Sequence, residues 1–395
     1  MGHAEREHQQ DEQRHPDSEK TLTIDASKVD ANEWLLNCNN GTVDLRTGLI
    51  RPHKPEDRIT KLIEVDYNPD ALAPVWNEVL SKITMEDGLG AGKPLANFLK
   101  RWFGYCATGS VREHKFLVHY GNGSNGKSTV LDTIAKVLGG YSGAAAPGLM
   151  MASKNDKHPA EIADLFGKRM VTSHETGDGG LLREDFVKSA TGGDIIKARF
   201  MRENFFEWKP THKLQLLTNY KPGVKGQDNG IWRRILLVPY QARFGTAEEF
   251  AAGRATHIKD TRIAEMLDGE LEGVLAWIVA GAIEWYRDGL QEPDVVRLAS
   301  DDYQGEQDRV KQYFEECCQY EKGAETPLTG NFGIFESYRS WCKDAGFNPI
   351  AKTRFTNELL RVVPLASVKE NRARVGAADR RRKQICYGIK LLEDE

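Results

Sequence analysis

The sequence predicts an α/β protein built on a largely parallel sheet, with a smaller unit of helices and strands at its C-terminus. Three observations support this prediction. The strand-like run Phe116–Val118 leads into a glycine-rich loop over residues 121–128, and a helical pattern follows over 129–138. Strand-like and helical segments alternate through residues 111–245, as in parallel sheets whose strands are joined by helices. Two helical segments and a strand-like end close the chain.

The glycine-rich loop is the most specific motif. It matches the phosphate-binding pattern G-x-x-x-x-G-K-[ST] at every fixed position, and the flanking strand and helix argue against a chance turn. Its glycines let backbone N–H groups close around phosphate oxygens, while the helix N-terminus adds positive charge. Lys127 is expected to reach the β- and γ-phosphates, and Ser128 to hold Mg²⁺. The expected ATP site comprises Gly121, Asn122, Gly123, Ser124, Asn125, Gly126, Lys127, Ser128 and Thr129.

Composition bounds the class of protein. The 395 residues suggest two or three domains, and 40% hydrophobic with 28% charged residues is ordinary for a soluble protein. A net charge of −4 argues against a uniformly basic nucleic-acid binder but permits local basic patches. Six scattered cysteines are typical of reduced thiols in a cytoplasmic protein. Without a long apolar run or signal peptide, we expect no membrane partner.

Domain boundaries follow changes in pattern. The expected units are a disordered tail over residues 1–20, an N-terminal α/β unit over 21–108, an ATPase core with a helical end over 109–292, a charged linker helix over 293–326, and a C-terminal unit over 327–395. In the N-terminal unit, Asn40-Gly41 predicts a hairpin turn, and Pro74 opens an amphipathic helix. The C-terminal order of helix, helix and hairpin is typical of a winged helix.

Polar residues end two further predicted strands. One strand ends at Glu175, where a nucleotide site needs an acid that holds Mg²⁺ and orients water. Such sites often have two adjacent acids, whereas here His174 precedes Glu175, so Glu175 is expected to act alone. Another strand ends before Asn219, whose amide is expected to position the attacking water. The alternatives are a solvated strand-end acid and a plain turn.

Two adjacent arginines, Arg233 and Arg234, begin the next strand-like run. An arginine finger stabilises charge on a phosphoryl group during its transfer. Neighbouring side chains on a strand point to opposite faces, so at most one of the two is expected to face a phosphate. The alternative is a pair of solvated or salt-bridged arginines.

Two basic regions are candidates for DNA binding. The first is a predicted hairpin over residues 195–208, in which Lys197, Arg199 and Arg202 are expected to contact phosphates without reading sequence. A solvated face is the alternative for these cations, and core packing is favoured for the hairpin's aromatic residues. The second basic region lies where the wing of the winged helix is expected. It suggests binding to duplex or origin DNA, and the alternative is a flexible charged loop. It comprises Arg372, Arg374, Arg380, Arg381, Arg382 and Lys383.

Taken together and in this order, these elements resemble the superfamily 3 helicases, and especially the helicase domains of phage and plasmid primase-helicases and poxvirus-type proteins. The segments Asn39–Leu45, Phe98–Tyr105 and Lys188–Asp194 add to the resemblance, which covers roughly residues 30–300. It implies an AAA+-like core and an ATP-driven ring, usually hexameric, that moves along one DNA strand, typically 3′ to 5′. It also implies a hairpin that grips DNA in the channel and an arginine finger that acts across the subunit interface.

The resemblance implies an ATP-hydrolysing DNA helicase of phage or plasmid replication, acting in the bacterial host cytoplasm. Many relatives carry a primase domain upstream, but the first hundred residues contain no strand with a paired-acid centre. We therefore expect priming to belong either to a separate primase or polymerase as a partner, or to an N-terminal region absent from this sequence. One alternative is an ATP-regulated initiator that binds and melts an origin without processive unwinding. Another is a nucleotide kinase or packaging motor, although a kinase would not explain the hairpin or the C-terminal cations.

Overall fold

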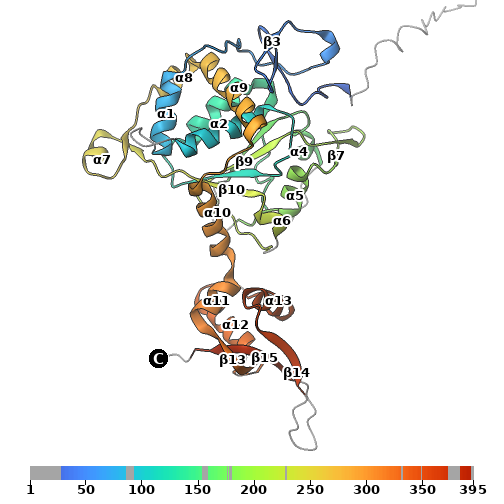
Figure 1. The fold of residues 1–395 in the computed structure, drawn as a ribbon, viewed down its shortest axis with the longest axis vertical. Helices are drawn as coiled ribbons and strands as arrows, with labels where there is room; N and C mark the ends of the chain where they lie inside the picture. Colours follow the sequence, from blue (N-terminus) through green and yellow to red (C-terminus); the bar gives the residue numbers. More distant parts are fainter. Residues whose placement is uncertain are drawn as a thin grey trace, which may run out of the picture.

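The computed structural model describes residues 28–85, 93–153, 159–175, 177, 180–226, 229–330, 332–347, 349–371 and 383–392. Figure 1 shows a large body, in which helices lie on both sides of a sheet, and a smaller C-terminal unit that is joined to it through helix α10. The expected tail over residues 1–20 lies outside the described residues.

The central sheet confirms the predicted fold class. Five strands, all parallel, lie in the order β10-β4-β9-β6-β5. Their bounds are β4 Phe116–Tyr120, β5 Ser142–Ala144, β6 Met170–Glu175, β9 Lys213–Thr218 and β10 Ile235–Pro239. The central strands are continuous apolar runs because both faces are covered. The strand order places β9 between β4, which precedes the phosphate loop, and β6, which ends in the candidate acid.

Two helical layers cover the sheet. One face packs against the helices α1 Pro74–Thr84, α2 Pro94–Ala107, α3 Lys127–Leu138, α8 Ile263–Asp268 and α9 Leu271–Asp288. The other face packs against α4 Pro159–Ala163, α5 Glu184–Gly192, α6 Asn229–Trp232 and α10 Asp294–Gln307. Helices α2 and α9 touch backbone to backbone, since a Cβ on Gly104 would lie 2.1 Å from the Ala282 nitrogen. Among the described helices, none is both long and apolar enough to cross a bilayer.

The N-terminal residues share the core of the ATPase body. A three-stranded antiparallel sheet holds β1 Leu35–Cys38, β2 Gly41–Asp44 and β3 Ile50–Arg51, followed by a short helix, η2 Pro55–Asp57. Cys38 pairs with Gly41, which confirms the predicted hairpin. Buried Leu36 and Val43 belong to the same hydrophobic cluster as α2, α3 and α9. Residues 28–85 and 93–107 therefore form one packed body with the nucleotide-binding sheet.

A buried cation joins these two parts. The guanidinium of Arg169, which precedes β6, donates to the carbonyl oxygens of Ala107 at 2.7 Å and Leu35 at 2.9 Å. It also lies over the ring of Tyr141, 4.5 Å from its centroid. Burial lowers the pKa of Arg169, and the carbonyl dipoles at the C-terminus of α2 stabilise its charge.

Short elements extend from the body. A hairpin of β7 Ile196–Ala198 and β8 Phe206–Trp208 projects from the sheet, as Figure 1 shows at the label β7. After β10 the chain forms β11 Phe244–Gly245, α7 Ala247–Ala251 and β12 His257–Ile258, and it returns to α8. A short 3-10 helix, η3 Gly139–Tyr141, connects α3 to β5.

The expected linker helix over residues 293–326 is replaced by three elements. Helix α10 packs on β10, where the hydroxyl of Ser300 accepts from the Leu237 backbone at 2.9 Å and buried Tyr303 donates to the carbonyl of Pro222. The chain breaks at Asp308, whose carboxylate caps the next helix by accepting from the Lys311 nitrogen at 3.2 Å. That helix and the following strand, α11 Arg309–Cys317 and β13 Cys318–Pro327, belong to the C-terminal unit.

The C-terminal unit has the predicted winged-helix arrangement, with a leading helix and strand added. After α11 and β13 come α12 Ile334–Asp344, α13 Lys352–Val362, β14 Ser367–Asn371 and β15 Lys383–Leu391, and the strands lie in the order β13-β15-β14. Its core packs separately from the body, around Tyr313, Tyr338 and Phe355. Residues 372–382, which connect β14 to β15, lie outside the described residues.

Candidate active site

The phosphate loop has a backbone that its glycines make possible. Gly123 and Gly126 adopt φ angles of 85° and 83°, in the left-handed region that favours glycine. A Cβ on Gly126 would lie 2.4 Å from the Cδ1 of Ile83, so any other residue there would force the Ile83 side chain to shift. The Phe244 nitrogen donates to the Ser124 carbonyl at 2.7 Å, which ties the loop to β11. The loop therefore has a defined shape.

Lys127 is a buried cation whose hydrogen-bond partners are neutral oxygens and not acids. Its Nζ donates to the carbonyl of Gly121 at 2.5 Å and to Oδ1 of Asn219 at 3.2 Å. Burial lowers the pKa of Lys127 to about 8. Among the described residues, no anion lies close enough to compensate the charge of the Lys127 ammonium, and a bound triphosphate would supply one. This geometry fits the role that the motif predicts.

Two predicted strand-end residues meet at the same edge of the sheet. In the register of the sheet, Thr218 of β9 lies beside Tyr120 of β4 on one side and Glu175 of β6 on the other. Asn219 follows Thr218 and contacts Lys127 directly. Glu175 lies one strand further away and faces a separate cavity of about 90 Å³ that Thr218 also lines. The structure thus brings Lys127 and Asn219 together and sets Glu175 beside them.

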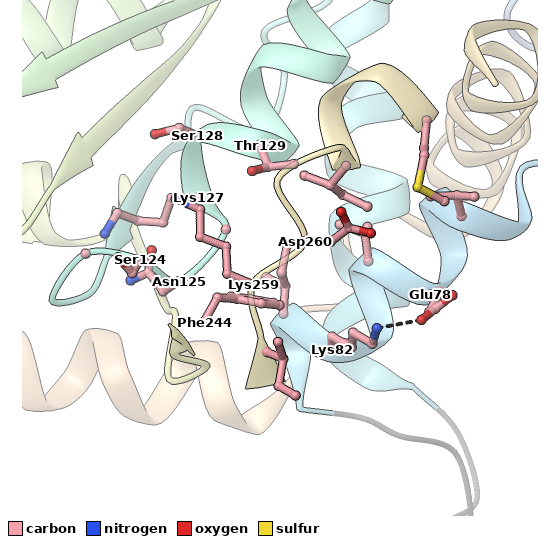
Figure 2. A pocket seen from close by; sticks show the side chains of 18 of the residues that line it. Glu78, Lys82, Ser124, Asn125, Lys127, Ser128, Thr129, Phe244, Lys259 and Asp260 are labelled. Carbon is pink, nitrogen blue, oxygen red and sulfur yellow. Dashed lines mark hydrogen bonds and ion pairs between the residues drawn. The ribbon is translucent and has the colours of Figure 1, made fainter. Parts of the chain in front are cut away.

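A larger cavity of about 440 Å³ opens in front of the loop. Figure 2 shows Lys127, Ser124 and Asn125 toward one end of it and Glu78 and Lys82 of α1 toward the other. The wall away from the loop is mainly apolar, and comprises Val75, Val79, Ile83, Phe244, Ile258, Ile263 and Met266. A cavity of this volume, with a phosphate-binding end and an apolar end, suits a nucleotide whose base would lie against the apolar wall.

The two arginines are placed differently from the sequence prediction. They lie in the turn before β10 and not on the strand, because helix α6 occupies residues 229–232. Arg234 is buried, and its guanidinium donates to Oγ1 of Thr191 at 3.1 Å and to the Gly230 carbonyl. Arg233 is exposed. This turn lies at the amino end of β10, opposite the edge that carries the phosphate loop.

The projecting hairpin presents its cations to solvent. Arg199 lies over the exposed ring of Phe205, with 4.9 Å between guanidinium and centroid. Lys197 pairs with Glu207 across the hairpin at 3.4 Å, with both side chains more than half exposed. Arg202 is exposed near the tip. The hairpin is therefore a solvent-facing surface with little attachment to the body at its tip.

Aromatic packing braces the base of the hairpin. Buried Trp208 stacks on Phe206 at 5.1 Å and meets Phe166 edge-on at 5.7 Å. The favoured interpretation, core packing, therefore holds for Trp208, whereas Phe205 is half exposed.

Most of the wing cations lie outside the described residues. Arg372, Arg374, Arg380, Arg381 and Arg382 lie outside the described residues, and Lys383 is placed only as the first residue of β15. Lys352 and Arg354 lie in the first turn of α13, and Arg354 donates to the Lys225 carbonyl of the body.

Comparison with known proteins shows what the chain is similar to. A family model described as "D5 N terminal like" matches residues 6–85. A protein named "Putative helicase" from Acanthamoeba polyphaga mimivirus is 26% identical over 333 residues, which make up 80% of this chain and 33% of that protein. These findings support a likeness to the phage and viral primase-helicases.

Other similar proteins agree in name. A "Putative helicase" from Frog virus 3 (isolate Goorha) is 29% identical over 232 residues, 56% of this chain and 23% of that protein. The chain spans a third or less of the length of these two relatives. Among solved structures, "The apo structure of NrS-1 C terminal region (305-718)" matches with a TM-score of 0.49 and 11% identity, covering 83% of this chain and 78% of that one.

The donor set at this edge of the sheet fits Mg²⁺. Ser128 is exposed in the first turn of α3, and Glu175 ends β6 at the same edge of the sheet. Hydroxyl and carboxylate oxygens are ligands that Mg²⁺ accepts while it retains waters and phosphate oxygens. Ser173, whose hydroxyl donates to Oε1 of Glu175 at 3.2 Å, would orient the carboxylate. Ser128 and Glu175 would hold the ion, which supplies charge neutralisation at the phosphates.

The sequence analysis did not identify the apolar wall of the cavity. Its residues come from α1, β11, β12 and α8, which are distant in sequence, and each looks like ordinary core. The structure supplies the link that the sequence lacks, because a Cβ on Gly126 would lie 2.4 Å from Cδ1 of Ile83, a residue of this wall. Helix α1 is thereby a component of the nucleotide site and not only of an N-terminal unit.

Nucleotide affinity is expected to fall as pH rises above about 8. Burial lowers the pKa of Lys127 to about 8, and a bound triphosphate would raise it, so binding takes up a proton above that pH. One proton taken up corresponds to about a tenfold loss of affinity per pH unit. Calorimetric titration with a non-hydrolysable ATP analogue between pH 7 and about 9.5 measures this slope.

Lys127→Arg is the matched control, because a guanidinium stays charged over this range. Its affinity should change little with pH. An equally steep fall in that variant would assign the titration to another group, and a flat profile in the unaltered protein would contradict the prediction.

Proposed function

We propose that this chain is the ATP-hydrolysing motor of a superfamily 3 DNA helicase, which assembles as a hexameric ring and translocates on one DNA strand. The observation that supports this most directly is the contact between Lys127 and Asn219 beneath the phosphate loop. It joins Lys127 to the residue that follows β9, and the last residue of β9, Thr218, lies in register with Glu175 of β6. The names of the viral relatives support the assignment to helicases.

Each residue has a distinct role in the proposed reaction. Lys127 neutralises charge on the β- and γ-phosphates, and the amide of Asn219 orients the attacking water. Glu175 would help to orient that water and, with Ser128, would hold Mg²⁺. Arg233 acts as the finger of the neighbouring subunit, because it is exposed and lies away from its own loop.

DNA binding is assigned to the projecting hairpin. Arg199, Lys197 and Arg202 lie on its exposed surface, where contacts to the phosphate backbone need no base recognition. The exposed pair between Lys197 and Glu207 is worth little in water, so phosphate can replace the carboxylate at low cost. In a ring, hairpins from all subunits would line the channel. Such contacts suit movement along any sequence.

A second candidate function is origin binding and melting without processive unwinding. The winged-helix arrangement of the C-terminal unit favours it, because such units commonly present a helix to the major groove. Displacement of a paired strand separates the two functions: a motor displaces a long duplex with ATP, whereas an initiator opens only its bound site.

The test uses the whole chain with forked DNA. ATP hydrolysis is expected to rise about tenfold with single-stranded oligonucleotide, and the fork is expected to be separated. Replacing Lys197 and Arg199 with alanine should reduce the DNA-stimulated rate and lower the salt slope of DNA binding by about 2, while the basal rate persists.

The paired control is Arg287→Ala with Arg297→Ala, two exposed cations on α9 and α10. It removes the same charge elsewhere and should leave stimulation unchanged. A protein that neither hydrolyses ATP faster with DNA nor separates the fork would refute the helicase proposal. Equal loss of basal and stimulated rates in the hairpin variant would assign a structural role to the hairpin.

A further inference from the structure

A chain of buried polar side chains lies behind the phosphate loop, on the sheet face that α2 covers. His119 of β4 contacts the Tyr240 hydroxyl through Nδ1 at 2.9 Å and Oε1 of Gln215 through Nε2 at 2.9 Å. The indole of Trp102 donates to the same oxygen of Gln215 at 3.0 Å. All four side chains are buried. The network links three neighbouring strands and a helix.

The direction of each hydrogen bond follows from its partners. An indole N–H only donates, so Oε1 of Gln215 is the acceptor, and the other amide atom donates to Sγ of Cys106 at 3.3 Å. Nε2 of His119 must therefore carry the hydrogen, and Nδ1 accepts from Tyr240. Burial lowers the pKa of His119 to about 4, so the imidazole stays neutral at ordinary pH. The ring nitrogens and the Tyr240 hydroxyl are thus held in one arrangement.

The same residues touch the nucleotide site at two points. The Tyr240 backbone donates to the Tyr120 carbonyl at 2.7 Å, and its carbonyl accepts from the side chain of Asn125 at 3.4 Å. A Cβ on Gly121 would lie 2.6 Å from the Tyr240 carbonyl, so the loop rests directly on this residue. Gln215 lies on β9, four residues before Asn219. One arm of the network therefore reaches the loop and the other reaches the strand that carries Asn219.

We propose that His119, Gln215 and Tyr240 are positioning residues that fix the phosphate loop relative to Asn219, and through both of them the alignment of water with the γ-phosphate. This inference rests on the ATP hydrolysis proposed above. Directional bonds restrict the sliding of β4, β9 and β10 past one another, which apolar packing alone does not. Hydrolysis is sensitive to such alignment, since displacements near 1 Å can cost about a hundredfold in rate.

Tyr240→Phe is the decisive variant. It removes only the hydroxyl that Nδ1 of His119 accepts from, and it leaves the backbone contacts of residue 240 with the loop in place. Gln215→Met is the second variant, because it keeps an unbranched side chain of similar length and removes the acceptor. Tyr313→Phe is the matched control: its buried hydroxyl donates to the Ile334 carbonyl at 3.0 Å in the C-terminal unit.

Steady-state ATP hydrolysis, nucleotide binding and thermal unfolding are measured for each protein. We expect kcat to fall about tenfold in Tyr240→Phe and Gln215→Met, with ADP affinity kept within about twofold and affinity for a non-hydrolysable triphosphate reduced. Tyr313→Phe should lower Tm by a similar amount and leave kcat unchanged. Rates equal to the unaltered protein in Tyr240→Phe would overturn the inference, and so would equal losses of ADP and triphosphate affinity.

The ATP hydrolysis rates of the unaltered protein and of the variants separate the positioning role from the proposed function. An unaltered protein that does not hydrolyse ATP would refute the function. In that case the ratio of triphosphate to ADP affinity still decides whether Tyr240 aligns the γ-phosphate end of the site. An active unaltered protein with fully active variants would refute only the positioning role.

Discussion

Replacing Lys127 with alanine is expected to abolish measurable ATP hydrolysis and to leave the fold intact. The Nζ atom is the cation that the structure places between the loop carbonyl of Gly121 and the amide of Asn219. Without it, charge that develops on the phosphates during transfer has no buried counterion, and loss of one such group typically costs about 10²–10³ in kcat. Nucleotide binding should weaken as well, because charge neutralisation acts in the ground state too.

The fold should tolerate this change. Burial already disfavours the charged form of Lys127, as its lowered pKa shows, so removing the ammonium offsets part of the packing that is lost. We expect the free energy of unfolding to change by no more than about 1 kcal/mol, measured by denaturant titration without nucleotide.

Lys136→Ala provides the control on the same helix, α3. Lys136 is half exposed and pairs with Asp268 at 2.6 Å, away from the loop. It should retain full hydrolysis. Normal turnover by Lys127→Ala would remove the loop from the mechanism, and global unfolding of that variant would show that Lys127 is required by the fold.

The sequence predicted the parts of the site that are local. The loop, Glu175 and Asn219 each follow a recognisable apolar strand, so the side chain at the strand end was visible without a structure. Their mutual arrangement was not visible, because the order of strands in a sheet depends on packing across the whole core. The insertion of β9 beside β4 is what allows Asn219 to contact Lys127.

The arginine pair and the linker show where pattern alone was misleading. Arg233 and Arg234 precede an apolar strand, but the short helix α6 fixes them in a turn, and only the structure shows that one is buried. Helix α10 carries Val296, Ser300 and Tyr303 on one face, at the helical spacing of i, i+4 and i+7. That spacing was a signal for packing against the body, hidden by the high charge of the segment.

Arg233→Ala and Arg234→Ala are expected to fail in different ways. Arg234 is bonded to Thr191 and Gly230, so its replacement leaves polar groups unpaired and should cost about 2 kcal/mol of stability. Arg233 is exposed, so its replacement should change stability by less than about 0.5 kcal/mol. A finger is worth about 10³–10⁵ in kcat, so Arg233→Ala should nonetheless lose hydrolysis. Thermal unfolding and ATPase rates measured together separate the two effects.

The position of Arg233 predicts that, as a finger, it acts on a neighbouring subunit. The five residues of β10, at about 3.3 Å each, put about 16 Å between this turn and the edge that carries the loop. Arg233→Ala mixed with Lys127→Ala should therefore regain activity, because an intact loop in one subunit can meet an intact finger from the other. Arg233→Lys should not replace the arginine, since an ammonium lacks the planar fork that binds phosphate oxygens. No recovery in the mixture, with mixed assemblies verified by mass, would mean that Arg233 is not a finger in trans.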